Sequence, residues 1–449
     1  MRRARSAAVE GGSDPAAPGR GRRRTGVHER KAARRMGRSS RAGLGAVTLN
    51  SAALALLMGI FAIVTGRVLG PHDRGIVVIF MTLSSMLMVL GSFGANTFAR
   101  VHLVSVKKRL PLKEYLGLIG VLATAQFAIS LIFGGLAMWA TNSLPNFTVL
   151  LFLVLYSVLN VVSYLLRDGI YAFGHNGRAS RGDPLAAALQ LVLVLAIWAT
   201  WGLTLDRALL VVTVSQACCA IYLLAQFRRV DLPLTVSLSW KSCLLQIRGG
   251  LPALITNLGQ TFIFRIDRLL LGFLATTTAV GIYSVAVTMT EALLLIPISI
   301  GQAMFHRLAS GRMRLEAMRR LRLTSLIISM AGAAVLGLVS PWLIELLFGR
   351  EYQLAVTPLR ILLVGAVAMG SYLVDVACMN AVGRLNSAAK LTLLGFILVG
   401  TFDLALIPPY AMNGAALASA IAYVVMAIAA AMRLRRISRR GESASTKGS

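Results

Sequence analysis

The sequence predicts an all-α integral membrane protein with about 12 transmembrane helices, and three features of the chain support this prediction. Of the 449 residues, 57% are hydrophobic and only 14% are charged, whereas a soluble domain has roughly 25% charged residues. Apolar runs long enough to cross a bilayer recur along nearly the whole chain. The basic residues gather in alternate connections between these runs. The chain is therefore expected to have little soluble mass.

Twelve apolar runs approach or exceed the length of about 20 residues that a helix needs to cross the hydrocarbon layer. The predicted spans are 44–66, 76–98, 115–139, 147–165, 184–203, 207–226, 249–275, 279–305, 323–347, 356–379, 387–407 and 413–432. The connections between these spans are short, so the chain has no room for a soluble catalytic domain.

These spans divide the chain into five regions. Residues 1–42 are rich in Arg, Gly, Ser and Ala without an apolar run, which predicts a disordered basic cytoplasmic tail rather than a signal peptide. The other predicted regions are an N-terminal six-helix bundle (43–226), a cytoplasmic linker (227–248), a C-terminal six-helix bundle (249–433) and a disordered cytoplasmic tail (434–449).

The distribution of Lys and Arg predicts the orientation in the membrane. With the N-terminus placed in the cytoplasm, 39 of the 46 Lys and Arg residues fall on the cytoplasmic side and five on the opposite side. Basic residues favour cytoplasmic loops, so both termini are predicted to be cytoplasmic. The net charge of +29 then follows from topology and from attraction to anionic membrane lipids. Nucleic acid is not an expected partner.

A weak internal repeat relates the two halves of the chain. GRVLGPHDRGIVV leads into the second span, and RLLLGFLATTTAVGIYSV leads into the eighth. In this comparison Gly70 corresponds to Gly272, and Gly75 corresponds to Gly281. Two six-span halves with the same orientation follow, as in transporters whose site lies between parallel repeats.

Motifs for covalent or metal-dependent chemistry are missing from the sequence. The four cysteines and five histidines show neither a CxxC pair nor the spacing of metal ligands. The sequence contains no DxD pair, no GxSxG and no nucleotide-binding Gly-rich loop in a suitable context. Neither a cofactor nor a metal site is expected.

Several segments together resemble one family. They are GRVLGPHDRG, then GLPALITNLGQTFIFRIDRLLLG followed by VGIYSVA, then GREYQLAVTPLRILL and finally NGAALASAIAYVV. Their order and spacing over residues 44–433 resemble the polysaccharide-biosynthesis flippases, in the superfamily that also holds multidrug antiporters and lipid II flippases. The resemblance implies two six-helix bundles related by a pseudo-two-fold axis around a V-shaped central cavity.

The same resemblance implies a function. Such proteins move undecaprenyl-diphosphate-linked oligosaccharides from the cytoplasmic to the outer leaflet of the bacterial plasma membrane by alternating access, without covalent chemistry. The implied partners are the lipid-linked oligosaccharide, membrane lipids, a polysaccharide polymerase and a chain-length regulator.

Charged residues inside the seventh and eighth spans are the leading site candidates. Arg265, Asp267 and Arg268 interrupt one apolar run, and Glu291 interrupts the next. Arg265 and Glu291 lie roughly 18 and 21 Å from the tip between these spans, at similar depth. One interpretation is an ion pair that fixes helix packing, either Arg265–Glu291 or Arg268–Asp267. The other is a cationic cavity in which guanidinium groups bind a diphosphate. Both interpretations can hold together.

Other charged residues are weaker candidates. Arg67, His72 and Arg74 lie in the predicted first outer loop, either solvated or receiving the headgroup at the outer mouth. Asp375 and Asp403 lie in the tenth and eleventh spans. Each is expected to pair with a nearby Ser, Tyr or Asn, or to bind a coupling proton or Na⁺. Arg100 and Arg307 end the second and eighth spans as interfacial anchors or as part of the inner mouth.

Two other functions remain as alternatives. A drug or cation antiporter of the same superfamily is disfavoured because the predicted first six spans contain no Asp or Glu. A membrane polysaccharide polymerase or ligase would need a sizeable outer loop, whereas the predicted outer connections, such as that near 347–356, have at most about a dozen residues.

Overall fold

The computed structural model of the chain describes residues 22–104, 110–140, 146–229, 235–309 and 315–445. Within these ranges the regular elements are all helices. The first half contains α1 (Arg22–Gly91), α2 (Ala95–His102), α3 (Leu112–Ala140), α4 (Phe147–Ala172), α5 (Asn176–Ala179), α6 (Gly182–Trp201) and α7 (Leu205–Arg229). The second half contains α8 (Trp240–Leu274), α9 (Thr277–Ala309), α10 (Leu315–Phe348), the 3₁₀ helix η1 (Arg350–Ala355), α11 (Val356–Ala381) and α12 (Leu385–Ser445).

Two of these helices are each a pair of membrane crossings. Helix α1 turns at Gly70, which has φ 75° and precedes Pro71, because a residue before proline is driven out of the helical region. Helix α12 turns at Ala411, just after Pro408 and Pro409. Nine described helical segments are long and apolar enough to span a membrane. Counting the two kinked helices twice and adding α8, the described chain supplies the predicted twelve crossings.

The second crossing ends earlier than predicted. Phe93 and Gly94 both have positive φ, at 47° and 68°, so the helix stops at Gly91 and the short α2 follows it. The predicted span 76–98 therefore includes a break that the apolar pattern does not reveal.

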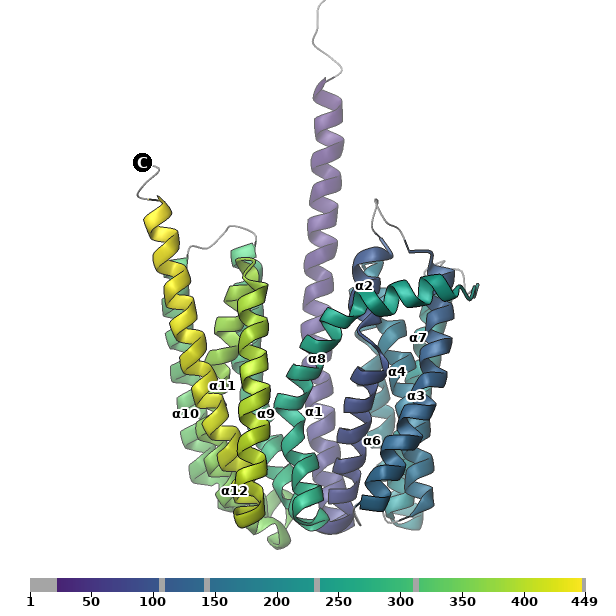
Figure 1. Cartoon of the computed structure of the whole chain (residues 1–449), viewed down its shortest axis with the longest axis vertical. Coiled ribbons are helices and arrows are strands. Elements are labelled where there is room, and N and C mark those ends of the chain that lie inside the picture. Colours follow the sequence, from purple (N-terminus) through teal and green to yellow (C-terminus); the bar gives the residue numbers. More distant parts are fainter. Residues whose placement is uncertain (1–21, 105–109, 141–145, 230–234, 310–314, 446–449) are drawn as a thin grey trace, which may run out of the picture.

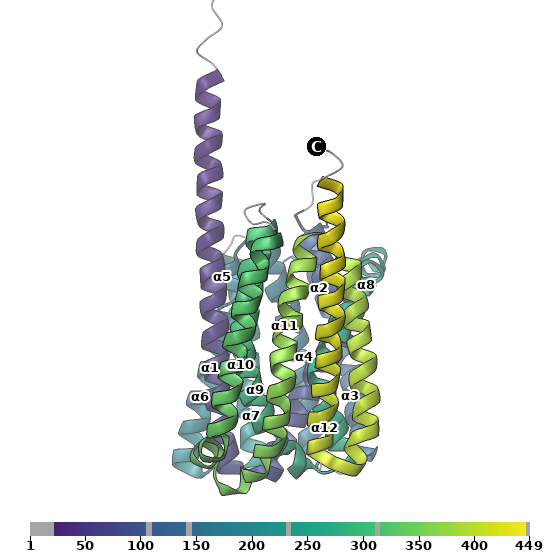
Figure 2. The same ribbon diagram turned by 90° about the vertical axis from the view of Figure 1, so that its left-hand side faces the viewer.

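The helices form two lobes that diverge toward one end of the molecule (Figure 1). Helices α1 to α7 form the N lobe, and α8 to α12 form the C lobe. The beginning of α1 and the end of α12 lie at the same end, which we call the terminal end, and Figure 2 shows this from the side. At the opposite end, which we call the closed end, the lobes lie together. This arrangement confirms the predicted all-helical, two-lobed fold.

Reciprocal backbone contacts at the closed end reveal the pseudo-two-fold relation. A Cβ atom on Gly75 would lie 1.9 Å from the carbonyl oxygen of Thr277. A Cβ atom on Gly281 would lie 1.8 Å from the carbonyl oxygen of Pro71. Each repeat-related glycine thus packs against the residue four positions before the other, as in a symmetric interface. Glycine is required at both positions because α1 and α9 approach this closely.

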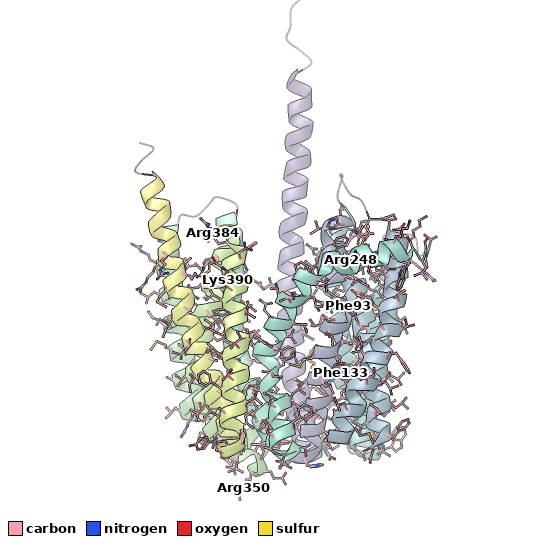
Figure 3. All side chains as sticks on the ribbon, viewed as in Figure 1. Phe93, Phe133, Arg248, Arg350, Arg384 and Lys390 are labelled. Atoms are coloured by element: carbon pink, nitrogen blue, oxygen red, sulfur yellow. The ribbon has the colours of Figure 1, made fainter. Side chains whose placement is uncertain are left out.

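The surface of the described chain fits a bilayer. Large apolar side chains such as Phe133, which is 45% exposed, point outward at mid-height (Figure 3). Charged side chains such as Arg384 and Lys390 lie toward the terminal end, and Arg350 lies at the closed end. The chain is therefore a multi-pass membrane protein.

The predicted tails differ from the structure in part. Helix α1 begins at Arg22 and α12 continues to Ser445, so residues 22–42 and 434–445 are helical. Their many Arg residues are good helix formers that extend the adjoining spans. Residues 1–21 and 446–449 lie outside the described residues. The bundle boundaries at 43–226 and 249–433 stay a prediction.

Candidate functional site

An ion pair at mid-height of the C lobe joins α8 to α9. The Arg268 guanidinium donates to the carboxylate of Glu291. The Arg268 side chain is only 11% exposed, whereas that of Glu291 is 51% exposed. Because a charge at this depth is costly in hydrocarbon, the exposed face of Glu291 indicates a polar space rather than lipid.

This pairing differs from both predicted ion pairs. The expected partner of Glu291 was Arg265, which lies at the more similar depth. Long side chains on a helix point toward its N-terminus. Arg268 therefore reaches toward the terminal end, and Glu291, on the antiparallel α9, reaches toward the closed end. The two meet although their Cα atoms differ in depth.

Asp267 faces the interior of the C lobe. It is buried, and its Oδ2 accepts a hydrogen bond of 2.8 Å from the hydroxyl of Tyr283. Its Oδ1 accepts from the backbone N–H of Arg268 at 2.8 Å. No ion pair joins the side chains of Asp267 and Arg268 within the described residues. The predicted Arg268–Asp267 ion pair is therefore wrong, and Asp267 is held by a tyrosine and a backbone N–H.

Arg265 is half-buried where the two lobes meet. Its electrostatic neighbours are Arg268, Glu291, Asp267 and, from α4 in the N lobe, Tyr156. The predicted Arg265–Glu291 ion pair therefore does not form among the described residues, although the two side chains lie within electrostatic range of each other. Tyr156 was missed in the sequence because a tyrosine in an apolar run carries no distinctive signal.

Arg74 is a third arginine near this cluster. The predicted solvated loop is wrong for this residue, because the helix resumes at Pro71 and Arg74 is buried. Its Nη1 donates to Thr65 Oγ1 at 2.5 Å, and its buried Nε has no hydrogen-bond partner among the described residues. Arg268 and Tyr352 are its electrostatic neighbours. Arginines from both lobes therefore lie within electrostatic range of each other.

Hydrogen bonds between the two lobes strengthen the closed end. The hydroxyl of Tyr352 in η1 donates to the carbonyl oxygen of Gly66 in α1 at 2.9 Å. Arg67 donates to the carbonyl oxygen of Leu346 in α10 at 2.5 Å. Arg67 thus ties α1 to the C lobe, and Tyr352 is a contributor that sequence reasoning missed.

The two weaker acidic candidates differ sharply. Asp375 is fully buried and forms an ion pair of 2.9 Å with Arg322 of α10. Its partner is therefore an arginine and not the expected Ser, Tyr or Asn. Asp403 is also fully buried, but neither of its oxygens has a hydrogen-bond partner among the described residues. Asp267 is its electrostatic neighbour.

The N lobe contains a buried acidic residue that lies outside the predicted spans. Helix α4 continues to Ala172 rather than ending at 165, and it contains the buried Asp168. Asp168 accepts from Arg100, whose guanidinium also lies 4.9 Å from the ring centroid of Tyr171. The predicted first six spans themselves contain no Asp or Glu, and Asp168 lies beyond the predicted fourth span, paired near the terminal end of α4. Asp168 directly follows the charged Arg167, so the apolar run was taken to end before both residues.

Metal-binding clusters of three or more His, Cys, Asp or Glu are absent from the described residues. The side chain of Arg307 lies outside them, so its predicted role at the inner mouth stays a prediction.

Comparison with known proteins agrees with this architecture. Residues 41–311 match the sequence profile of a family described as polysaccharide biosynthesis protein. No curated protein matches the sequence. The fold is similar to that of the lipid II flippase MurJ in an inward closed conformation, with a TM-score of 0.73, 12% identity and 87% of each chain covered.

Multidrug transporters share the fold as well. An inward-facing MATE family transporter of the MOP superfamily gives a TM-score of 0.61 at 17% identity, covering 86% of this chain and 96% of the other. An outward-facing MATE transporter gives 0.58 at 17% identity, covering 90% and 97%. The chain therefore shares the fold of membrane transporters.

Proposed function

Because the chain belongs to the polysaccharide biosynthesis protein family, we propose that it is a flippase for undecaprenyl-diphosphate-linked oligosaccharides. It moves them from the cytoplasmic to the outer leaflet of the bacterial plasma membrane by alternating access. The observation that carries this proposal is the set of Arg74, Arg265 and Arg268 from the two lobes, in which Arg268 lies within electrostatic range of both other arginines. Three guanidinium groups match the charge and the paired oxygens of a diphosphate.

Glu291 has a specific part in this proposal. It neutralises Arg268 while the site is empty, and its half-exposed carboxylate can separate from the arginine when a cargo diphosphate arrives. Bidentate hydrogen bonds from arginine to phosphate then replace the single ion pair. Glu291 thereby lowers the cost of keeping buried cations in the resting protein.

Asp403, next to Asp267, is the proposed site for a coupling cation. Two nearby buried carboxylates repel each other when both are ionised, and a bound proton or Na⁺ relieves this repulsion. Asp403 has no hydrogen-bond partner among the described residues to compensate its charge. Asp375 is less suited to this role because Arg322 already compensates it.

The terminal end is the proposed cytoplasmic end. The excess of Lys and Arg in the connections on that side supports this orientation. The closed end then faces outward, and the lobes diverge toward the side where the cargo is made. A polymerase and a chain-length regulator are proposed partners that receive the translocated unit.

A deletion strain tests the function directly. Lipid-linked oligosaccharides are extracted after an impermeant glycan-labelling reagent has been applied to intact spheroplasts. Complete but unlabelled units, trapped on the cytoplasmic face, are the expected result. Labelled units that remain unpolymerised would instead indicate a polymerase or ligase. Normal export with increased drug sensitivity would indicate an antiporter of the same superfamily.

A further inference from the structure

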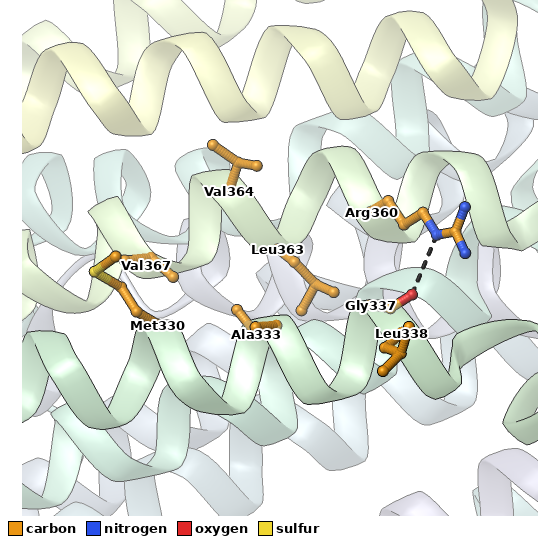
Figure 4. A pocket seen from close by; sticks show the side chains of 9 residues that line it. Met330, Ala333, Gly337, Leu338, Arg360, Leu363, Val364 and Val367 are labelled. Carbon is orange, nitrogen blue, oxygen red and sulfur yellow. Dashed lines mark hydrogen bonds between the residues drawn. The ribbon is translucent and has the colours of Figure 1, made fainter.

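A groove runs along the outer surface of the C lobe between α10 and α11 (Figure 4). Its volume is about 690 Å³. Leu338 on one rim is 81% exposed, and Val364 on the other is 65% exposed, so the groove opens to the surroundings of the protein. Apart from one arginine, its lining is apolar and includes Met330, Ala333, Leu338, Leu363, Val364 and Val367.

Small residues on α10 create this space. Ala333, Ala334 and Gly337 line the groove where larger side chains would fill it. The α10 side extends from Met330 to Leu338, about 12 Å along the helix axis. In a membrane protein such a groove faces hydrocarbon, and an empty groove would forfeit dispersion contacts along its whole length. A lipid chain is therefore its natural occupant.

The exception to the apolar lining is Arg360. It lies at the end of the groove that is nearer the closed end of the molecule. It lies four residues after the start of α11, about 6 Å along the helix. Its Nε donates to the carbonyl oxygen of Gly337 at 3.2 Å, the dashed line in Figure 4. Pro341 explains why this oxygen is available, because proline lacks the N–H that would bond to the carbonyl four residues earlier. The bond anchors the guanidinium beside the groove.

This anchoring leaves the terminal nitrogens of Arg360 free to bind a ligand. No carboxylate forms an ion pair with Arg360 within the described residues, and Glu345, later on α10, is paired with Arg350 at 2.8 Å. Gln353 also donates to Glu345, at 3.2 Å. Among the described residues, Arg360 is thus a cation without a counter-ion, at the polar end of an apolar groove. Arginine is well suited to phosphate because of its planar, multiple donors.

We propose that this groove binds an anionic phospholipid, with one acyl chain between α10 and α11 and the phosphate on Arg360. A single guanidinium matches a phosphodiester with one charge, whereas the proposed cargo carries a diphosphate. The groove is lined by α10 and α11, while the arginine cluster lies on α1 and α8. The lipid site is therefore separate from the proposed transport site, and it does not depend on the proposed function.

A second groove provides an internal comparison. It lies between α9 and α10 on the other side of α10, has a volume of about 510 Å³ and has an entirely apolar lining that includes Ile296, Ile327 and Val335. Without a charged residue it is expected to accept an acyl chain with no preference for the headgroup. The two grooves separate the effect of apolar shape from the effect of Arg360.

Native mass spectrometry of the full-length protein in detergent tests the proposal. The protein is titrated with phosphatidylglycerol or with phosphatidylcholine of the same acyl chains. Wild type is expected to bind phosphatidylglycerol about fivefold more tightly in its most retained adduct, the effect of one basic residue near a lipid headgroup. Arg360→Gln is expected to lose this preference and retain one fewer anionic lipid. Ala333→Phe, which fills the groove, is expected to weaken binding of both lipids.

Arg350→Gln is the matched control, because Arg350 is exposed near the same end but paired with Glu345. The proposal is overturned if wild type binds the two lipids equally. It is also overturned if Arg360→Gln retains as many anionic lipids as wild type, or if Arg350→Gln loses as many. A dimer that dissociates when Ala333→Phe is introduced would assign the groove to a second copy of the chain instead. The wild-type titration decides the question even if a variant fails to fold.

Discussion

The two lobes share one fold but place their charges differently. In the N lobe, the ion pairs Arg100–Asp168 and Arg167–Asp183 lie near the terminal end of the helices. In the C lobe, the pair Arg268–Glu291 lies at mid-height, and the buried Asp403 lies near Asp267. A charge at the centre of a membrane helix costs about 2.5–3.5 kcal/mol on insertion scales, while a charge near the interface costs much less.

The comparison separates structural charge from functional charge. A repeat that needed ion pairs only for packing would keep them at the same depth in both halves. The N lobe packs its mid-height with residues such as Phe80, Leu153 and Val194. This difference favours the proposal that the mid-height charges of the C lobe have a role beyond packing, and the following variants test it.

The largest effect is expected for Arg268→Ala and for Arg265→Ala. Each removes a guanidinium from the proposed diphosphate site, and a charge-assisted hydrogen bond contributes about 1.5–3 kcal/mol, so export is expected to be abolished. Surface polysaccharide is measured together with the amount of protein in the membrane. Arg350→Ala, at an exposed position, is the control and should export normally. Normal surface polysaccharide in both cluster variants would remove these arginines from the cargo site.

The next largest effect is expected at the repeat-related glycines. Gly281→Leu and Gly75→Leu would each push a side chain into the opposite helix backbone. Because the contact is reciprocal, both variants should open the closed end and reduce export by at least about tenfold, with overpacking costs of about 1–3 kcal/mol. Accessibility of a cysteine introduced at Thr277 measures the opening.

Gly400→Leu is the control for these glycines, since nothing lies within 4 Å of its added Cβ. If export tolerated leucine at one of the two glycines and not at the other, the contact would not be equivalent in the two lobes.

A smaller effect is expected for Asp403→Asn. The variant keeps the shape of the side chain but removes the buried charge near Asp267, so transport should lose its dependence on an applied cation gradient while some export remains. Transport in proteoliposomes with and without a pH or Na⁺ gradient measures this dependence. An unchanged response to both gradients would exclude Asp403 from coupling.

The smallest effect on transport is expected for Asp168→Asn in the N lobe. Loss of the ion pair with Arg100 should lower the free energy of unfolding by about 1–3 kcal/mol, whereas export should stay near wild type. Thermal unfolding and surface polysaccharide are measured on the same variant. A loss of export as complete as that of Arg268→Ala, at normal protein levels, would erase the proposed distinction between the lobes.

The fold was largely predictable, because span length and charge asymmetry are properties of sequence alone. The turn at Gly70 and Pro71 was visible as a helix breaker between two apolar runs. The break at Phe93 and Gly94 was not, because Phe93 is apolar and its positive φ leaves no sign in the apolar pattern. Apolar pattern measures how much of a chain prefers lipid, and it does not report a local change of direction.

The sequence predicted which residues belong to the candidate site better than it predicted the contacts between them. Intramembrane charge identified Arg265, Arg268 and Glu291, and Arg268 and Glu291 do form an ion pair. Depth alone selected the wrong arginine as the partner of Glu291, since it ignores the direction in which side chains lean. The burial of Arg74 and the isolation of Asp403 depend on neighbours from distant parts of the chain. Such neighbours require the tertiary structure.

The reciprocal packing of Gly75 and Gly281 has a consequence for ancestry. An identical pair of half-length chains could make the same contact twice across a true symmetry axis, as a homodimer. Six crossings return a chain to the side on which it began, so two such genes could fuse through a short connector with no inversion of either copy. Fusion would free the copies to diverge: the glycines would have to stay alike because each meets the other's backbone, while the two copies could acquire different charges.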